Sequence, residues 1–150
     1  MGIQLHNELE TAAYARTFLD QLVADTQHAT VVGLSGDLGA GKTTFTKKVG
    51  SALGISDEIL SPTFVLAKFY QIPTGKKWTQ LVHIDAYRIE DEHELVALRF
   101  SELLSDPKKL IIIEWPEQLP SQYPAYAHTL RFDTIDEHIR SVEEIHEQSN

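Results

Sequence analysis

The fold of this chain is decided by residues 30–44, which read Thr30-Val31-Val32-Gly33-Leu34-Ser35-Gly36-Asp37-Leu38-Gly39-Ala40-Gly41-Lys42-Thr43-Thr44. The apolar start of this stretch predicts a buried strand, and the closely spaced glycines after it predict a tight loop. Beyond the loop, Phe45, Val49 and Leu53 recur at the spacing of one helix face. The stretch therefore predicts a strand, a glycine-rich loop and a helix in direct succession.

The loop carries the pattern G-x-x-x-x-G-K-[ST]. In this pattern backbone N–H groups surround phosphates, the lysine reaches the outer phosphates and the hydroxyl ligates Mg²⁺. Glycine permits positive φ and close backbone approach, and the positive end of the following helix favours an anion. We therefore predict a P-loop, or Walker A motif, with the metal at Thr43. The predicted nucleotide-binding residues in it are Gly36, Asp37, Leu38, Gly39, Ala40, Gly41, Lys42, Thr43 and Thr44.

Length and composition restrict the class of protein. The chain has 150 residues, about the length of one domain, so we expect a single domain over residues 1–150. It contains no cysteine, which excludes disulfides and thiol chemistry and fits a reducing compartment. The N-terminal residues lack a basic segment followed by an apolar core, and no apolar run reaches membrane-spanning length. We therefore expect a cytoplasmic protein that does not enter a membrane.

The charge of the chain bears on its partners. The formal net charge is −9 at pH 7. A large basic surface for DNA or RNA is therefore not expected, because neutralisation of phosphates by Lys and Arg dominates such binding. Any contact with nucleic acid is expected to run through a partner protein.

The remaining secondary structure is predicted from periodicity and capping residues. Asn7 and Glu10 resemble a capping box that opens an amphipathic helix ending near Asp25. A second cap pattern, Asp91 with Glu94, opens a helix that ends at Asp106-Pro107. Strands are predicted over residues 65–72, 78–85, 110–114, 129–135 and 139–145, with a helix as the alternative for the last range.

Two features of these strands set the fold class. Residues 73–77 form a turn by composition, so the strands on either side are expected to pair as an antiparallel hairpin. Residues 110–113 are apolar without alternation, as in a strand buried on both faces of a parallel sheet. We therefore predict an α/β fold, a P-loop NTPase-like three-layer sandwich. Its mixed sheet has parallel core strands and antiparallel hairpin strands, with helices on both faces.

A P-loop enzyme needs a second carboxylate at the end of a neighbouring strand to hold the metal. Glu114 and Asp85 each close an apolar strand, and the run before Glu114 is the more continuous. We assign Glu114 to Mg²⁺. We assign Asp85, with Lys42, to catalysis near the γ-phosphate, where the carboxylate could orient or deprotonate the attacking water. Acidic residues also occur at strand ends merely because the next loop is solvated. A solvated position without a catalytic or metal-binding role therefore stays open for either residue.

Two further residues are candidates for a nucleotide switch. Thr63 follows Pro62, between the helix after the P-loop and the next strand, and could offer a mobile hydroxyl to the metal or γ-phosphate. Pro62 can equally serve only to shape a turn. Arg88 lies three residues beyond Asp85 and could pair with that carboxylate or with phosphate. A solvated surface position for Arg88 is an equal alternative.

Trp115 directly follows the presumed metal ligand and precedes Pro116, which favours an extended backbone at the tryptophan. The indole could flank the nucleotide, dock a partner or cover the core. The seven histidines show no metal-ligand spacing, so we interpret them as structural or solvated.

Four motifs occur together in a recognisable order. They are Gly36-Asp37-Leu38-Gly39-Ala40-Gly41-Lys42-Thr43-Thr44, Ser61-Pro62-Thr63-Phe64, His83-Ile84-Asp85-Ala86-Tyr87-Arg88 and Glu114-Trp115-Pro116-Glu117. In these motifs the chain resembles the TsaE family, also called YjeE, of bacterial ATPases for tRNA threonylcarbamoyladenosine biosynthesis. The resemblance covers about residues 30–120, and residues 121–150 carry no motif.

The resemblance implies a small P-loop ATPase that binds and hydrolyses ATP with Mg²⁺, weakly when alone. It implies work with the TsaD–TsaB complex, which attaches a threonylcarbamoyl group to a tRNA adenosine beside the anticodon. TsaE is thought to reset that complex between turnovers, so it would meet tRNA only indirectly. By position, Lys42 and Thr43 match the phosphate and metal residues, and Glu114 the Walker-B-type ligand. Asp85 matches the suspected catalytic carboxylate, and Trp115 a site-adjacent aromatic residue.

Two other classes of protein stay open at this point. A small-molecule or nucleotide kinase could use the same loop, although phosphate-rich acceptors usually need several arginines in a lid. A nucleotide-dependent binding switch with negligible turnover is the second, although the chain lacks the N-K-x-D segment by which GTPases read guanine. The arginines are scattered along the chain, at Arg16, Arg88, Arg99, Arg131 and Arg140.

Overall fold

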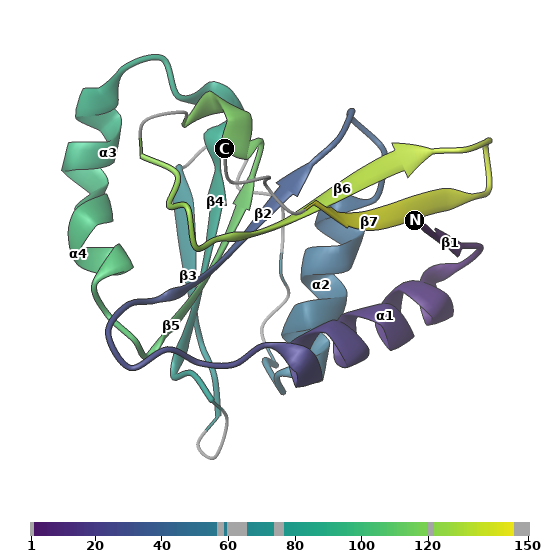
Figure 1. Cartoon of the computed structure of the whole chain (residues 1–150), viewed down its shortest axis with the longest axis horizontal. Coiled ribbons are helices and arrows are strands. Elements are labelled where there is room, and N and C mark those ends of the chain that lie inside the picture. The colour runs from purple at the N-terminus through teal and green to yellow at the C-terminus, as the bar shows by residue number, and fades with distance from the viewer. Residues whose placement is uncertain (1, 57–58, 60–65, 74–76, 120–121, 146–150) are drawn as a thin grey trace.

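β2 (Thr30–Ser35) lies at the centre of a seven-stranded sheet with the strand order β1-β7-β6-β2-β5-β4-β3 (Figure 1). The structure is a computed structural model, and it describes residues 2–56, 59, 66–73, 77–119 and 122–145. The other strands are β1 (Ile3–Leu5), β3 (Ala67–Gln71), β4 (Gln80–Asp85), β5 (Lys109–Glu114), β6 (His128–Thr134) and β7 (Arg140–Ile145). The helices are α1 (Glu8–Gln21), α2 (Lys42–Ala52), α3 (Glu92–Leu98) and α4 (Phe100–Leu104), with 3-10 turns η1 (Ala86–Arg88) and η2 (Pro116–Gln118).

The sheet combines parallel and antiparallel pairs. β2 pairs in parallel with β5 and β6, and β5 pairs in parallel with β4. β3 pairs antiparallel with β4, and β7 pairs antiparallel with both β6 and β1. The predicted mixed sheet and the hairpin of β3 and β4 are therefore confirmed. The last predicted range forms a strand, because β7 pairs with β6 along its whole length.

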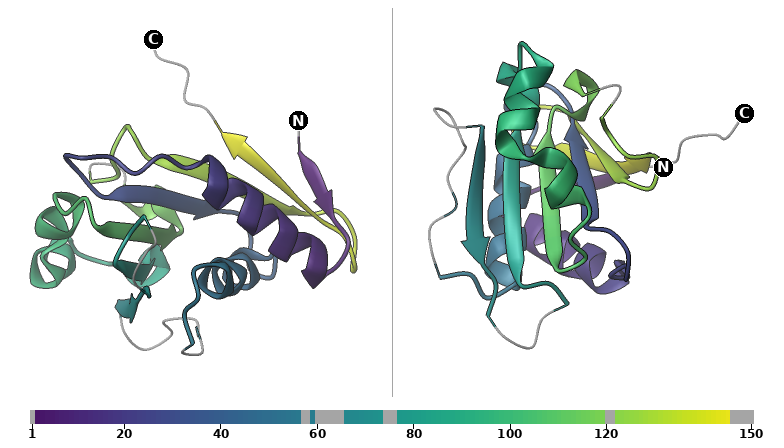
Figure 2. Two further views of the ribbon diagram at one scale, coloured as in Figure 1. Left: turned by 90° about the horizontal axis from the view of Figure 1, so that it is seen from below. Right: turned by 90° about the vertical axis from the view of Figure 1, so that its left-hand side faces the viewer.

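Helices cover both faces of the sheet, as predicted. One apolar cluster joins α1 and α2 to the sheet, and a second joins α3 and α4 to the opposite face. Figure 1 shows α3 and α4 on the far side of the strands from the other two helices, and Figure 2 shows α1 beside α2. Because side chains alternate along a strand, Leu110 and Ile112 of β5 face α2, whereas Ile111 and Ile113 face α3 and α4. Glu114 therefore points to the side of α2.

Both predicted helix caps are present. The Asn7 side chain accepts a 2.9 Å hydrogen bond from the Glu10 N–H, and Asp91 with Glu94 forms a capping box before α3. The expected single helix after this box is in fact two, because Arg99 has a left-handed backbone with φ 60° and ψ 47° between α3 and α4. Within the described ranges no helix has the length and apolarity needed to cross a membrane.

The sequence predicted that this first helix ends near Asp25, but α1 ends at Gln21. Leu22 already has an extended backbone. The ammonium group of Lys77 donates to the carbonyl oxygens of Leu19 at 3.1 Å and Leu22 at 2.6 Å. A cation at this end satisfies carbonyls that lack intrahelical partners and complements the helix dipole. A lysine 55 residues further along the chain therefore stabilises this end, which no local pattern could indicate.

Candidate functional site

The predicted phosphate loop joins β2 to α2 in the order that the motif requires. Gly36 has φ 136°, and a Cβ atom there would collide with the carbonyl oxygen of Phe132. Gly41, the N-cap of α2, has φ 109°, and no side chain among the described residues caps this helix. The first N–H groups of α2 are therefore directed toward the loop, as in an anion-binding helix N-terminus.

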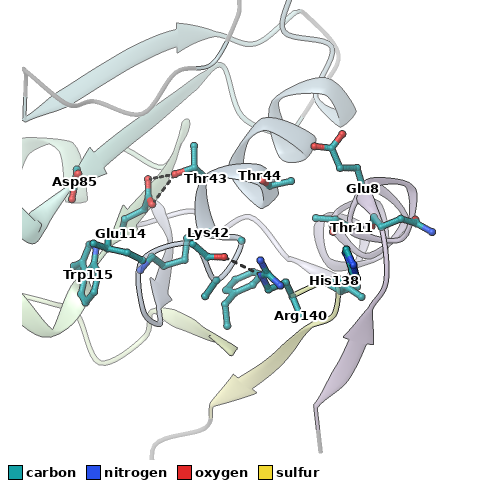
Figure 3. Close-up of a pocket in the computed structure, with 17 residues that line it drawn as sticks. Glu8, Thr11, Lys42, Thr43, Thr44, Asp85, Glu114, Trp115, His138 and Arg140 are labelled. Carbon is teal, nitrogen blue, oxygen red and sulfur yellow. Dashed lines mark hydrogen bonds between the residues drawn. The ribbon is translucent and has the colours of Figure 1, made fainter. Parts of the chain in front are cut away.

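An open pocket of about 360 Å³ lies beside this loop (Figure 3). All the predicted loop residues line it except Gly36 and Asp37, and so do Asp85, Glu114 and Trp115. The pocket also has walls that no motif indicated. They are Leu5, Asn7, Glu8 and Thr11 near the start of the chain and Phe132, His138 and Arg140 from the last two strands.

The Thr43 hydroxyl and the Glu114 carboxylate meet at the start of α2. The hydroxyl donates to Oε1 of Glu114 at 3.1 Å, and Oε2 lies 3.5 Å away (Figure 3). Glu114 is the last residue of β5 and is only 4% exposed. Its Oε2 lies 2.6 Å from Nε2 of His83, an interaction that we did not expect from the sequence. The two predicted metal residues are thus brought together, with a buried imidazole beside them.

Asp85 ends β4 next to Glu114, since these two residues are paired in the parallel register of β4 and β5. The Asp85 carboxylate accepts a 3.0 Å hydrogen bond from the Tyr87 N–H and so caps η1. In Figure 3 it lies beyond Glu114, on the side away from Thr43. The two candidate carboxylates therefore share one edge of the sheet at unequal distances from the loop.

The Lys42 side chain is folded back over its own loop. Its ammonium group donates to the Gly36 carbonyl oxygen and, at 3.4 Å, to that of Asp37. The same group lies 3.7 Å from the centre of the Trp115 ring. Burial lowers the pKa of Lys42 below its usual range, and the nearby carboxylates of Glu114, Glu117, Asp85 and Asp37 oppose this shift. The lysine is 5% exposed, so its charge depends on these contacts for stabilisation.

Trp115 does not have the extended backbone that we expected before Pro116. Its φ is 63° and its ψ is 53°, a left-handed conformation. Its N–H donates to the Leu34 carbonyl oxygen at 3.0 Å, and its ring centre lies 5.0 Å from that of Tyr87. The bond to β2 and the ring contacts hold the backbone in a conformation that local sequence disfavours. The indole consequently faces Lys42 at the pocket.

The two candidate switch residues are Thr63 and Arg88. Thr63 and its motif lie outside the described residues. The backbone of Arg88 ends η1, the turn that directly follows Asp85.

Sequence reasoning missed the contribution of the C-terminal strands. Arg140 of β7 lines the pocket and donates from Nε to the Gly39 carbonyl oxygen at 2.9 Å. His138, in the turn before it, lies near Thr11 of α1 in Figure 3. No motif marked these residues, because their positions depend on the pairing of β6 with β7. His83 did lie in a motif, but we had interpreted it, with the other histidines, as structural or solvated.

The residues present fit a Mg²⁺–nucleotide. Mg²⁺ prefers hard oxygen ligands and is usually held by one or two carboxylates together with substrate phosphates. Thr43 and Glu114 supply such oxygens next to a loop of backbone N–H groups and a lysine. In the part of the chain that the structure describes, no three His, Cys, Asp or Glu side chains gather into a metal site of their own. The arrangement thus suits a metal that shares its ligands with phosphates.

Comparison with known proteins agrees with this geometry. The family model described as "Threonylcarbamoyl adenosine biosynthesis protein TsaE" matches residues 5–143. A tRNA threonylcarbamoyladenosine biosynthesis protein TsaE from Streptomyces coelicolor is 46% identical over 90 residues, which is 58% of this chain and 57% of that protein. The protein of the same name from Rickettsia typhi is 38% identical over 114 residues, or 75% of this chain and 72% of that protein.

A solved structure has the same fold. The crystal structure of Bacillus subtilis YdiB superimposes with a TM-score of 0.69 and 26% sequence identity, covering 96% of this chain and 83% of YdiB. The matched part spans little more than half of the Streptomyces relative. The family match, in contrast, extends over nearly all of the described residues. The chain therefore belongs to the TsaE family of threonylcarbamoyl adenosine biosynthesis proteins.

Proposed function

We propose that this chain is a Mg²⁺-dependent ATPase that acts on the TsaD–TsaB transferase complex in tRNA threonylcarbamoyladenosine synthesis. The observation that carries the proposal is the contact of Thr43 with Glu114 at the start of the helix that follows the phosphate loop. Family membership supports the biosynthetic role, and this contact supports the ATP chemistry. The cytoplasmic location that the sequence led us to expect belongs to the same proposal.

The pocket residues have three separate roles in hydrolysis, which are phosphate binding, metal binding and activation of water. The N–H groups at the start of α2 and the Lys42 ammonium bind the phosphates, which requires Lys42 to leave the carbonyl oxygens of Gly36 and Asp37. Thr43 and Glu114 hold Mg²⁺, which when bound neutralises charge on the phosphates. Asp85 orients the attacking water or accepts its proton at the same sheet edge.

The charge of the protein supports an indirect role toward tRNA. With a net charge of −9 the chain suits contact with a partner protein better than contact with a polyanion. We infer that TsaD and TsaB receive the effect of ATP hydrolysis, that hydrolysis resets them between turnovers, and that tRNA is reached through them.

The proposal is tested by measuring ATP hydrolysis with the protein alone and with purified TsaD–TsaB. We expect weak turnover alone, stimulation by the complex and no phosphorylated acceptor. The Lys42→Ala variant in the same mixture is the matched control, and it should remove the stimulated turnover. A stoichiometric phosphorylated metabolite would indicate a kinase instead. Tight ATP binding with no turnover under either condition would indicate a binding switch.

A further inference from the structure

The imidazole of His83 is fully buried beneath the phosphate pocket, at 0% exposure in the middle of β4. Its Nε2 lies 2.6 Å from Oε2 of Glu114. Burial of a polar ring in an apolar strand costs free energy unless its polar atoms are hydrogen-bonded. His83 therefore needs a specific role for its ring, since an apolar side chain would fill this place in the sheet at lower cost.

The contacts of the ring assign its proton. Nδ1 of His83 has no hydrogen-bond partner among the residues that the structure describes. A neutral imidazole has one donor nitrogen and one acceptor nitrogen, and a carboxylate can only accept. Nε2 must therefore donate its proton to Oε2 of Glu114, which leaves the lone pair on Nδ1. A buried lone pair without a partner is less costly than a buried N–H without one.

This hydrogen bond fixes which oxygen of Glu114 faces the loop. His83 is the second residue before Asp85 on β4, so both side chains lie on the face of the sheet toward α2. With Oε2 bound to His83, Oε1 is the oxygen closer to the Thr43 hydroxyl, at 3.1 Å against 3.5 Å for Oε2. A glutamate has several rotatable bonds, and a second anchor restricts them before any ligand arrives.

We propose that His83 is a positioning residue, which holds the Glu114 carboxylate with Oε1 toward Thr43 so that the pair can bind Mg²⁺ together with nucleotide phosphates. The inference rests on the proposed function, since it concerns the metal of that same site. Residues that orient a metal ligand typically change metal affinity by about 10-fold to 100-fold when they are lost. His83 acts through Glu114 and does not contact the nucleotide pocket itself.

Three substitutions separate the hydrogen bond from the bulk of the ring. The amide nitrogen of His83→Gln reaches about as far as Nε2 and can still donate to Glu114. The amide nitrogen of His83→Asn reaches only as far as Nδ1, and His83→Leu has no donor. We measure ADP affinity by calorimetry over a series of Mg²⁺ concentrations and in EDTA. We expect the Asn and Leu variants to need a Mg²⁺ concentration for ADP binding that is higher than that of the parent by about 10-fold or more. The Mg²⁺ requirement of the Gln variant should stay within about 3-fold of that of the parent.

A double variant distinguishes positioning from a general loss of structure. If His83 acts through Glu114, the Mg²⁺ requirement of Glu114→Gln should change little when His83→Leu is added. The affinity for ADP in EDTA should stay close to that of the parent in all single variants of His83. Additive effects, or an equal loss of affinity with and without Mg²⁺, would overturn the inference. If His83→Leu does not fold, the comparison of His83→Gln with His83→Asn decides.

The ring proton gives a readout that needs neither metal nor nucleotide. Nitrogen-15 NMR of the imidazole in the nucleotide-free protein should show a protonated Nε2 that shifts in Glu114→Gln. An Nε2 without a proton would contradict the hydrogen bond on which the inference depends. If the ADP affinity of the parent protein does not depend on Mg²⁺, the proposed function is refuted. If it does depend on Mg²⁺ and His83→Leu has the same Mg²⁺ requirement as the parent, only the role of His83 is refuted.

Discussion

Arg140 on β7 donates from Nε to the carbonyl oxygen of Gly39 at 2.9 Å, so the last strand of the described chain contacts the phosphate loop (Figure 3). The same guanidinium donates from another nitrogen to the Asp136 carbonyl oxygen, also at 2.9 Å. One arginine therefore fastens the loop to the turn between β6 and β7. The loop conformation depends on a strand that lies 101 residues away in the sequence.

Replacement of Arg140 should weaken nucleotide binding. Arg140→Ala removes a hydrogen bond from a charged donor to the loop, and such a bond contributes about 1.5 kcal/mol or more. We expect ADP affinity to fall about 10-fold in calorimetry, since that free energy corresponds to about one decade. Arg131→Ala is the matched control, because Arg131 pairs with Glu143 and lies outside the pocket. Equal affinities for the two variants would show that the arginine does not support the loop.

The two carboxylates at the sheet edge should have separable effects. Glu114→Gln removes an anionic oxygen beside Thr43, so we expect a higher Mg²⁺ requirement for ATP binding. Asp85→Asn should slow the hydrolysis of bound ATP about 100-fold or more while changing ATP affinity little. Single-turnover hydrolysis and equilibrium binding measured on both variants test this. If Asp85→Asn lost binding and kept turnover of bound nucleotide, the two roles would be exchanged.

The fold was predictable where the pattern is local. The strand, loop and helix of residues 30–44 have unambiguous spacing, and the apolar run before Glu114 correctly predicted a strand with parallel neighbours on both sides. The amphipathic helix α1 was predicted, and its Phe18 and Leu19 are buried, but Leu9 is 80% exposed whereas Thr11 is 7% exposed. β1 escaped prediction because a three-residue edge strand depends on its pairing with β7. Errors therefore occurred where distant segments decide the structure.

The candidate site follows the same rule. The motifs were sufficient to predict that Thr43 and Glu114 lie close together, because Glu114 ends β5 and Thr43 begins the helix after β2, the parallel neighbour of β5. The conformation of Trp115 could not be predicted, since it depends on a hydrogen bond to β2 and a contact with Lys42. The wall at Arg140 could not be predicted either, because no local pattern states how β7 lies relative to the loop.

Lys77 should contribute to stability from outside the site. Lys77→Met keeps an apolar stem of similar length and removes the ammonium that binds the last carbonyls of α1. We expect the free energy of unfolding to fall by about 1 kcal/mol. The exposed Lys47→Met serves as the control in the same urea titration, and it should be close to neutral. An equal loss in both variants would mean that the helix end does not need the cation.

A buried hydrogen bond between Trp78 and Thr30 allows a sharper test of packing. The indole Nε1 donates to the threonine hydroxyl at 2.9 Å, with Trp78 at 2% and Thr30 at 5% exposure. Thr30→Val keeps the shape and leaves a buried N–H without its acceptor, which costs about 1–3 kcal/mol. Thr30→Ser keeps the acceptor and should be milder. If chemical denaturation shows a lower free energy of unfolding for Thr30→Ser than for Thr30→Val, this account is wrong.

Tyr14 should make the stability of the protein sensitive to alkaline pH. Burial raises the pKa of Tyr14 from 10.0 to about 12, and the carboxylate of Glu144 adds to the shift. The side chain packs against Phe18 and Phe45, with ring centres 6.2 Å and 6.0 Å away. The folded protein therefore holds the phenolic proton more tightly than the unfolded chain does. Stability from this source is complete below the unfolded pKa and is lost as the pH rises toward the folded pKa.

Tyr14→Phe removes this titration, so its free energy of unfolding should fall less steeply than that of the parent between about pH 10 and pH 12. Urea titrations across that range measure the two slopes. If the free energy of unfolding falls equally steeply with pH in the parent and in Tyr14→Phe, the loss of stability at alkaline pH comes from other groups. Only a proton that the folded state holds more tightly than the unfolded chain can make the two slopes differ.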